Sequence, residues 1–210
     1  MLAGGVPAYL RPRLERGGSL LEPVLEERLD RWPGEVEILD VGAGPITALG
    51  TVSAERRVRI TAVDPLAEDY DVILAEAGIE PPVRTMTCAG EDLLERFGPD
   101  SFHAAFARNS VDHALDPVRV VGNMLAVVRP GGSVVLRHRR NEGRTRRWLD
   151  FHQWNFDVSD GQLVLWGRRE AHRIGDLLAP GDSLDCWIEP AADGLDPWVV
   201  AAIDRGEPAT

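Results

Sequence analysis

Short apolar runs alternate with segments of helical periodicity through the first two thirds of this chain. The apolar runs predict five strands, at residues 36–41, 58–63, 83–87, 102–107 and 133–137. The segments between them place apolar residues at helical spacing, at 47–53, 67–77, 91–97 and 117–128. Because strand and helix alternate strictly, the strands are expected to lie parallel and to be joined by right-handed crossovers. The pattern therefore predicts an open, doubly wound α/β sheet.

The chain before the first strand predicts one helix. Ser19 is the expected N-cap, with Glu22 three residues later, and apolar residues recur at helical spacing as far as Trp32. Pro33 and Gly34 are expected to end this helix.

The alternation stops after residue 140. Arg, Trp and His side chains crowd the segment 141–156, and the turn at Asp160 and Gly161 predicts a hairpin with a strand at 162–166. A short helix is expected at 172–178. Two further strands, at 184–188 and 198–203, are expected to pair antiparallel and to close the sheet.

Composition and charge exclude several classes of protein. The formal net charge of −11 argues against nonspecific binding to nucleic acid, because phosphates would be repelled. No apolar run approaches the roughly 20 residues that cross a bilayer, and residues 1–10 do not resemble a signal peptide, so a cytoplasmic protein without membrane contact is expected. Cys88 and Cys186 lie far apart without metal-ligand spacing and are expected to be buried free thiols. All 23 basic residues are arginines, which excludes a Schiff-base lysine.

A glycine turn follows the first predicted strand, and an acid ends the second. Gly42 and Gly44 would let a ligand approach the backbone, and Asp64 stands where a carboxylate accepts hydrogen bonds from a ribose diol. These features alone also fit a dinucleotide site. However, Thr47 replaces the third small residue of that motif, and Asp40 before the glycines would attract an amine and repel a pyrophosphate.

Together these motifs resemble the class I S-adenosylmethionine-dependent methyltransferases. The resemblance rests on ILDVGAGP at 38–45, TAVDP at 61–65 and VVRPGGSVVL at 127–136, and the segment 90–117 is similar to the part between the third strand and the fourth helix. It implies a Rossmann-like sheet of seven strands, mostly parallel, with an antiparallel last strand. It also implies S-adenosyl-L-methionine as the cofactor. A small lid and hairpin are expected as an insertion after the fifth strand.

One domain is expected over 1–210, because the chain is too short for two separate cores. Its expected parts are an N-terminal helical segment at 1–34, a cofactor-binding core at 35–140, a lid and hairpin at 141–170, and a closing helix and strands at 171–210.

The resemblance implies which residues meet the cofactor. Its amino acid end would lie at the glycine turn and its ribose at Asp64, with Pro65 and Leu66 beside the adenine and Glu91 or Asp92 at the adenine amino group. Ala89 stands where an acid is common, and His103 replaces a usual aspartate of the fourth strand. The residues assigned to the cofactor are Asp40, Gly42, Ala43, Gly44, Asp64, Pro65, Leu66, Glu91, Asp92 and Asn109.

Candidate catalytic residues follow the fourth and fifth strands, because ligands of open parallel sheets bind beyond the carboxyl ends of the strands. They are Asp112, His113 and His138, joined by His152 of the HQWNF segment at 152–156. That segment resembles one in a poorly characterised bacterial branch of these methyltransferases. His152 or His113 is expected to act as general base, with Asp112 or Asn109 orienting the base or the substrate.

Structural roles are the alternatives for these residues. In one alternative the segment 113–117 only begins a helix, with Asp116 as N-cap and Pro117 at its first position, and His113 is packed rather than reactive. In the other, HQWNF is a structural plug and His152 has no catalytic role. Asp112 and His113 are adjacent and expected to point differently, with no clear third ligand, so no metal site is expected.

Residues 138–156 are expected to fold over the site as a lid, with Trp148 and Trp154 excluding water. Six arginines between residues 137 and 147 suggest an anionic acceptor, and a solvated face paired with acids is the alternative. These arginines are Arg137, Arg139, Arg140, Arg144, Arg146 and Arg147.

The sequence therefore predicts an S-adenosylmethionine-dependent methyltransferase that methylates an oxygen of a small, anionic or sugar-like molecule. A homodimer is compatible with the sequence. A nicotinamide-dependent (NAD(P)) oxidoreductase and a noncatalytic S-adenosylmethionine-binding subunit are the alternatives.

Overall fold

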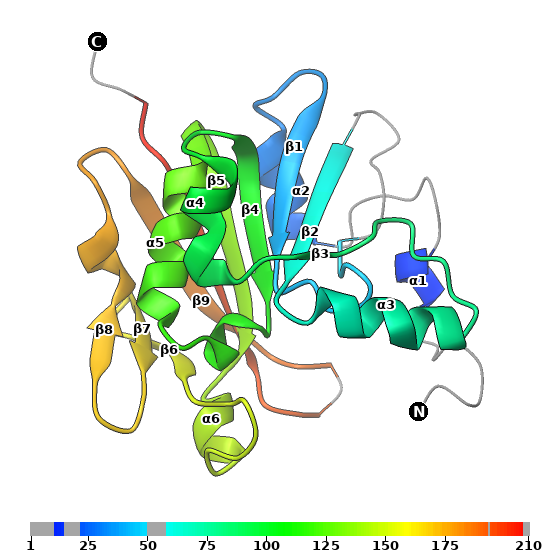
Figure 1. Cartoon of the computed structure of the whole chain (residues 1–210). Coiled ribbons are helices and arrows are strands. Elements are labelled where there is room, and N and C mark those ends of the chain that lie inside the picture. Colours follow the sequence, from blue (N-terminus) through cyan, green and yellow to red (C-terminus); the bar gives the residue numbers. More distant parts are fainter. Residues whose placement is uncertain (1–10, 15–21, 50–57, 193, 208–210) are drawn as a thin grey trace.

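A seven-stranded sheet forms the centre of the computed structural model, which describes residues 11–14, 22–49, 58–192 and 194–207 (Figure 1). The strand order is β3-β2-β1-β4-β5-β10-β9. Strands β1 to β5 pair parallel, and β10 runs antiparallel to both of its neighbours. This confirms the doubly wound sheet with an antiparallel last strand. The strands are β1 Val36–Val41, β2 Val58–Asp64, β3 Met86–Thr87, β4 Phe102–Arg108, β5 Val128–Arg139, β9 Ser183–Glu189 and β10 Trp198–Asp204.

Helices cover both faces of this sheet. Figure 1 shows α4 and α5 on one face, and α2 lies against the other. The α-helices are α1 Arg11–Leu14, α2 Pro23–Leu29, α3 Ala67–Glu76, α4 Leu93–Phe97, α5 Pro117–Val127 and α6 Glu142–Thr145. The short 3-10 helices are η2 Gly90–Asp92, η3 Val111–His113 and η4 Ile174–Leu177. No helix of the described segments is long and apolar enough to cross a membrane.

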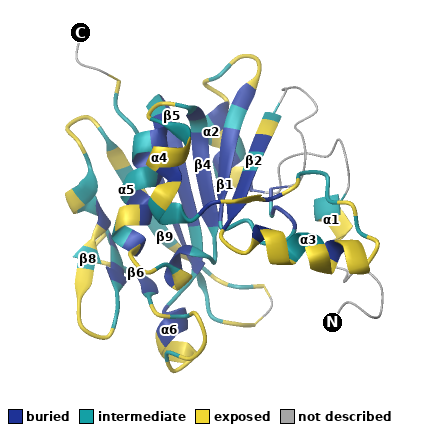
Figure 2. Cartoon of the chain, in the orientation of Figure 1, coloured by how far each residue is buried: buried dark blue, intermediate teal, exposed yellow. Residues whose placement is uncertain are grey.

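The core has two parts because alternate residues of a strand face opposite sides of a sheet. Leu39 of β1 packs with Met124 of α5 on one side. Ile38 of β1 and Phe106 of β4 pack with Leu25 of α2 on the other. The central strands are therefore buried on both faces, as Figure 2 shows, which suits a parallel sheet covered by helices.

A second, three-stranded antiparallel sheet is inserted after β5. It consists of β6 Asn155–Ser159, β7 Gln162–Trp166 and β8 Ala171–Arg173, so the expected hairpin is confirmed. The helix expected at 172–178 is wrong in its first part, because His172 belongs to β8 and only the 3-10 turn η4 follows. The added strand pairs Leu165 with His172 and extends the hairpin.

The N-terminal helix begins later than predicted. It starts at Pro23, and Glu22 occupies the N-cap position without a side-chain capping bond. The carboxylate of Glu22 instead accepts two hydrogen bonds from Arg137, at 2.7 and 3.0 Å. The expected cap Ser19 lies outside the described residues.

Two other predicted elements differ from the structure. Residues 47–49 form a turn, and the rest of the helix expected at 47–53 lies outside the described residues. The turn is held by Thr47, whose hydroxyl accepts a hydrogen bond from the amide of Leu49 at 3.2 Å. The strand expected at 83–87 is confined to Met86–Thr87.

Both cysteines are free thiols, as expected. Cys88 is buried, whereas Cys186 on the edge strand β9 is only half-buried, so the expectation of burial is correct for one of them.

Candidate active site

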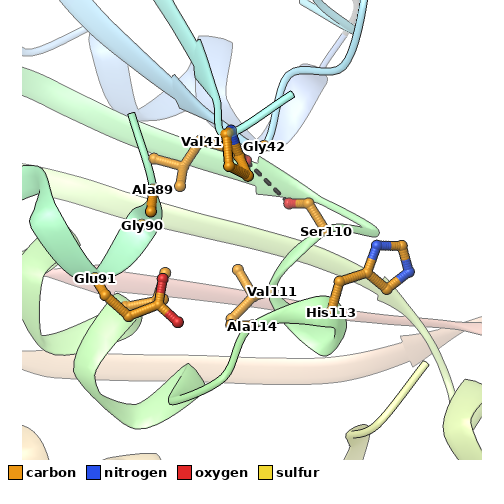
Figure 3. Close-up of a pocket in the computed structure, with 11 residues that line it drawn as sticks. Val41, Gly42, Ala89, Gly90, Glu91, Ser110, Val111, His113 and Ala114 are labelled. Atoms are coloured by element: carbon orange, nitrogen blue, oxygen red, sulfur yellow. Dashed lines mark hydrogen bonds between the residues drawn. The ribbon is translucent and has the colours of Figure 1, made fainter. Parts of the chain in front are cut away.

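The glycine turn after β1 lies close against the end of β4. Gly42 and Gly44 both have positive φ, at 67° and 66°. A Cβ added to Gly42 would lie 2.3 Å from Cβ of Ser110, whereas one added to Gly44 would meet nothing within 4 Å. The hydroxyl of Ser110 also donates a hydrogen bond to the carbonyl of Val41 at 2.9 Å (Figure 3). Glycine is thus required at position 42 by close packing as well as by conformation, and Ser110 is a site residue that sequence reasoning missed.

Asp40 lies beneath this turn and is almost fully buried, with 1% of its surface exposed. Its carboxylate accepts a hydrogen bond from the Thr47 hydroxyl at 2.5 Å. Burial raises the pKa of Asp40 to about 6, and the bond from Thr47 limits the rise. Thr47 is itself fully buried, so it fills the position that a dinucleotide site would keep small. This packing disfavours the nicotinamide alternative.

Asp64 joins the end of β2 to the glycine turn. One carboxylate oxygen accepts a hydrogen bond from the amide of Gly44 at 3.1 Å, and the other accepts one from the amide of Leu66 at 2.9 Å. A carboxylate has about four lone-pair positions, so two remain for the hydroxyls of a ribose. The residue therefore fits its predicted partner while also fixing the turn.

A cavity of about 90 Å³ opens beside the turn, at the carboxyl ends of the parallel strands (Figure 3). Gly42, Pro65 and Glu91, three of the predicted cofactor residues, line it together with the catalytic candidate His113. The complete lining is Val41, Gly42, Pro65, Ala89, Gly90, Glu91, Ser110, Val111, His113, Ala114 and Val120.

Glu91 and Asp92, predicted as alternatives, lie in different surroundings. The carboxylate of Glu91 accepts hydrogen bonds from the amides of Leu115 at 3.0 Å and Asp116 at 3.1 Å, so it holds the chain before α5 against the cavity. Asp92 is exposed and lies 3.9 Å from Arg119. The geometry favours Glu91 of the two.

The other predicted cofactor residues do not line this cavity. Asn109 has a left-handed backbone with a φ of 49°, and its side chain accepts a hydrogen bond from the amide of Arg139 at 2.9 Å. That contact ties β4 to β5. The predicted residues outside the cavity lining are Asp40, Ala43, Gly44, Asp64, Leu66, Asp92 and Asn109.

Three of the four catalytic candidates converge at one point. Nδ1 of His152 lies 2.7 Å from Oδ2 of Asp112. Nε2 of His113 lies 3.0 Å from the same nitrogen of His152 and 3.4 Å from Oδ2 of Asp112. Asp112 and His113 were expected to point differently, and this expectation is wrong, because the 3-10 turn η3 brings both side chains toward His152.

Backbone hydrogen bonds hold the HQWNF segment against this turn. The amides of Gln153 and Trp154 both donate to the carbonyl of Asp112 at 3.1 Å. The indole of Trp154 donates to the carbonyl of Ala114 at 3.1 Å. Trp154 therefore lies at the site as expected, whereas Trp148 packs edge-on against Trp166 of the small sheet.

His138, the fourth candidate, lies behind Asp112. Its ring stacks on Phe156 with the centroids 3.9 Å apart, and its Nδ1 is 3.7 Å from Oδ1 of Asp112. Within the described residues, neither ring nitrogen of His138 nor Oδ1 of Asp112 has a hydrogen-bond partner. The buried Glu142, which sequence reasoning missed, lies near the other ring nitrogen of His152, with Oε1 3.9 Å from Nε2.

The pKa values of His113 and His152 are shifted in opposite directions. Burial alone would raise the pKa of Asp112, but the imidazoles of His138 and His152 outweigh it and hold this pKa below its usual value. Burial lowers the pKa of His113. The hydrogen bond to Asp112 raises the pKa of His152. The cluster thus contains a carboxylate, a neutral His113, and a His152 that holds a proton more firmly.

Several arginines of the run at 137–147 contact acidic or aromatic side chains. Arg137 is held by Glu22 and Glu189, each at 2.7 Å. Arg140 lies 2.7 Å from Asp157. Arg146 pairs with Glu142 at 3.6 Å, Arg139 lies over the ring of Trp198, and Arg144 lies near Trp166. These contacts agree better with the paired-face alternative than with an open anion site.

Comparison with protein families finds a match of residues 39–136 to the methyltransferase domain. This segment runs from the glycine turn to β5 and includes the cavity. Comparison with curated proteins found no match.

Solved structures with the same fold include several methyltransferases. The 1,6-didemethyltoxoflavin-N1-methyltransferase of Burkholderia thailandensis, with its substrate and S-adenosylhomocysteine bound, is 17% identical at a TM-score of 0.53 over 95% of this chain and 79% of its own. An S-adenosylmethionine-dependent methyltransferase of Methanosarcina mazei is 16% identical at a TM-score of 0.54 over 89% of this chain and 99% of its own.

Phosphoethanolamine N-methyltransferase 2 of Haemonchus contortus, bound to phosphomonomethylethanolamine and S-adenosylhomocysteine, is 12% identical at a TM-score of 0.58. The match covers 88% of this chain but only 52% of that protein. Identities this low support the shared fold and do not define the acceptor.

Proposed function

We propose that this chain, which belongs to the class I S-adenosylmethionine-dependent methyltransferases, transfers a methyl group to an oxygen atom of a small molecule. One observation carries the proposal: His113 lines the cavity with Gly42 and Glu91, and the same side chain contacts Asp112 and His152. A cofactor site and a cluster able to accept a proton therefore share one wall.

The residues around the turn suit the cofactor S-adenosyl-L-methionine, which supplies an electrophilic methyl group on a sulfonium cation. Asp64 has lone pairs left for a ribose, and Pro65 offers an apolar surface for the adenine. Glu91 lines the same wall. Asp40 places a carboxylate beneath the turn, where it would attract the amino group.

Methylation of a hydroxyl requires a group that takes its proton. Nε2 of His113 faces Asp112 and His152, so Nδ1 is the nitrogen left to accept a proton from the acceptor. The imidazolium that forms would be stabilised by the buried carboxylate of Asp112. His152 would hold that carboxylate in place, so His113 is the base and Asp112 and His152 position it.

The acceptor itself stays a prediction. The arginine run suggested an anionic acceptor, and the acidic partners of Arg137, Arg140 and Arg146 weaken the support for an anion. A hydroxyl of a neutral or sugar-like molecule requires only the histidine cluster. A cytoplasmic location and a homodimer stay predictions as well.

The test is transfer of tritium from methyl-labelled cofactor to a panel of small alcohols, phenols, carboxylates and amines. The amines are included because two neighbours in fold are named as N-methyltransferases. Transfer to oxygen should give labelled methyl ethers from the alcohols and phenols, or labelled methyl esters from the carboxylates. Labelled amines alone would contradict the oxygen acceptor, and cofactor binding without transfer to any acceptor would favour the noncatalytic alternative.

A further inference from the structure

We propose that Asp112, His113 and His152 form a binding site for one divalent transition-metal ion such as Zn²⁺. This inference goes beyond methyl transfer and does not depend on it. The ligand atoms would be Oδ2 of Asp112, Nε2 of His113 and Nδ1 of His152, which lie within 4.8 Å of one another.

The distances among the three atoms suit a common ion. They are 2.7 Å from His152 to Asp112, 3.0 Å between the histidines, and 3.4 Å from His113 to Asp112. Atoms with this spacing can each lie about 2.0–2.2 Å from one point, which is the usual length of zinc bonds to imidazole nitrogen and carboxylate oxygen.

Protons alone do not satisfy all of these contacts. Nδ1 of His152 carries at most one hydrogen, yet it has two close polar neighbours. If this hydrogen points to Asp112, Nδ1 of His152 has no lone pair left to accept a hydrogen bond from Nε2 of His113. If His113 donates to His152 instead, two lone pairs face each other across the 2.7 Å contact with Asp112. A cation between the three atoms satisfies every lone pair at once.

Polar side chains lie near the cluster, just beyond hydrogen-bond distance, where metal ligands usually have outer partners. A histidine that binds an ion through Nδ1 carries its hydrogen on Nε2, and Nε2 of His152 faces Oε1 of Glu142 at 3.9 Å. The free oxygen of Asp112 faces His138 at 3.7 Å. Carboxylates in this outer position orient the imidazole and increase its affinity for the ion.

Two nitrogens and one oxygen favour zinc, cobalt, nickel or iron(II) over magnesium or calcium, which prefer oxygen. Three protein ligands leave a coordination position free, and the side chain of His113 is 37% exposed, so solvent can reach the ion. His113 would bind the ion through Nε2 and keep its hydrogen on Nδ1. It therefore cannot act as a base while the ion is bound, and the two functions belong to different states of the cluster.

The test is titration of the full chain, stripped with a chelator, with Zn²⁺ in a calorimeter and with Co²⁺ followed by its visible absorption. The expected result is one ion per chain. Glu142→Gln should weaken Zn²⁺ binding by about 10-fold or more, because loss of a residue that contacts a metal ligand usually costs roughly 10–100-fold. His113→Ala and His152→Ala each remove a ligand and should weaken binding by more than that. Asp112→Asn keeps the shape of the side chain and should also lose the Co²⁺ spectrum.

His172→Ala is the matched control, because His172 also lies beside a carboxylate, that of Glu170 at 3.3 Å, but outside the cluster. It should bind Zn²⁺ as the unmodified chain does. The proposal is overturned if the folded unmodified chain binds neither ion, or if the affinity is lost in His172→Ala and retained in His152→Ala. Binding of S-adenosylhomocysteine is measured on the same samples, so failure of the metal site is distinguished from failure of the cofactor site.

Discussion

Nδ1 of His152 lies 2.7 Å from Oδ2 of Asp112, although 40 residues separate them in the chain. Asp112 comes from the turn after β4, and His152 from the segment between α6 and β6. Their contact links the carboxyl end of the parallel sheet, where ligands of such sheets bind, to the insertion that follows β5. It also places His113 at the wall of the cavity with a buried carboxylate behind it.

Replacement of His113 tests its assignment as the base. His113→Ala should lower kcat by about 10²–10⁴-fold, the usual contribution of a positioned base, and should still bind S-adenosylhomocysteine. The assay is run with a chelator, so that the ring is free of metal. His172→Ala should retain the kcat of the unmodified chain. Equal kcat values for the unmodified chain, His113→Ala and His152→Ala would refute proton transfer to this cluster.

The close approach of Gly42 to Ser110 predicts a loss of stability on substitution. Gly42→Ala should lower the free energy of unfolding by about 2–4 kcal/mol, because the new Cβ overlaps Ser110 and the backbone has a positive φ. Gly44 also has a positive φ, but a Cβ added there would meet no other atom. Gly44→Ala should therefore lower the free energy of unfolding by only about 1 kcal/mol. Chemical denaturation measures both.

The double variant Gly42→Ala with Ser110→Gly separates the two causes. Removal of the Ser110 side chain relieves the overlap, so the double variant should recover part of the lost stability. If both single glycine variants lose equal stability, the packing argument for Gly42 is incorrect.

The buried Asp40 predicts an unusual dependence of stability on pH. Its pKa in the folded protein is about 6, above the ordinary value of 3.8, so the folded state binds the proton more tightly than the unfolded state does. The carboxyl therefore favours folding most at low pH, and this contribution is lost as the pH rises from about 4 to 6. At about 1.4 kcal/mol for each pKa unit, the charged form costs the folded state about 3 kcal/mol above pH 6.

Asp40→Asn should thus be more stable than the unmodified chain at pH 7.5, and the difference should shrink by pH 4.5. Thr47 can still donate its hydrogen bond to the amide oxygen, and the other groups that act on Asp40 are Arg13, Asp64 and the backbone of Ala48. Denaturation curves at the two pH values measure the difference. A variant that is less stable than the unmodified chain at pH 7.5 would contradict the cost of the buried charge.

Most of the sheet could be predicted from sequence because its signals are local. Apolar runs and helical spacing repeat within short windows, and Asp116 with Pro117 begins α5 as the sequence predicts, with the amide of Arg119 bonded to the Asp116 carboxylate at 2.9 Å. The turn at 47–49 differs from the predicted helix because the hydrogen bond from Thr47 to Asp40 forms only in the folded chain.

The site was predictable only in part. Gly42 and Asp64 belong to motifs that can be identified along the sequence, whereas Ser110 and Glu142 gain their roles from tertiary contacts that no local spacing encodes. The side chain of His113 points toward His152 because of the 3-10 turn η3. This turn has only three residues, too few for a periodic pattern, so the sequence does not predict it.

The most direct test of the cofactor site is calorimetric measurement of S-adenosylhomocysteine binding to the unmodified chain, to Asp64→Ala and to Asp71→Ala. Asp71 is the matched control, because its carboxylate is also hydrogen-bonded, to Arg84, but on the surface of α3. The unmodified chain and Asp71→Ala should both bind S-adenosylhomocysteine, and Asp64→Ala should bind it at least about 10-fold, or 1.4 kcal/mol, more weakly. Absence of binding to the folded unmodified chain, or equal affinity for all three proteins, would contradict the proposed cofactor site.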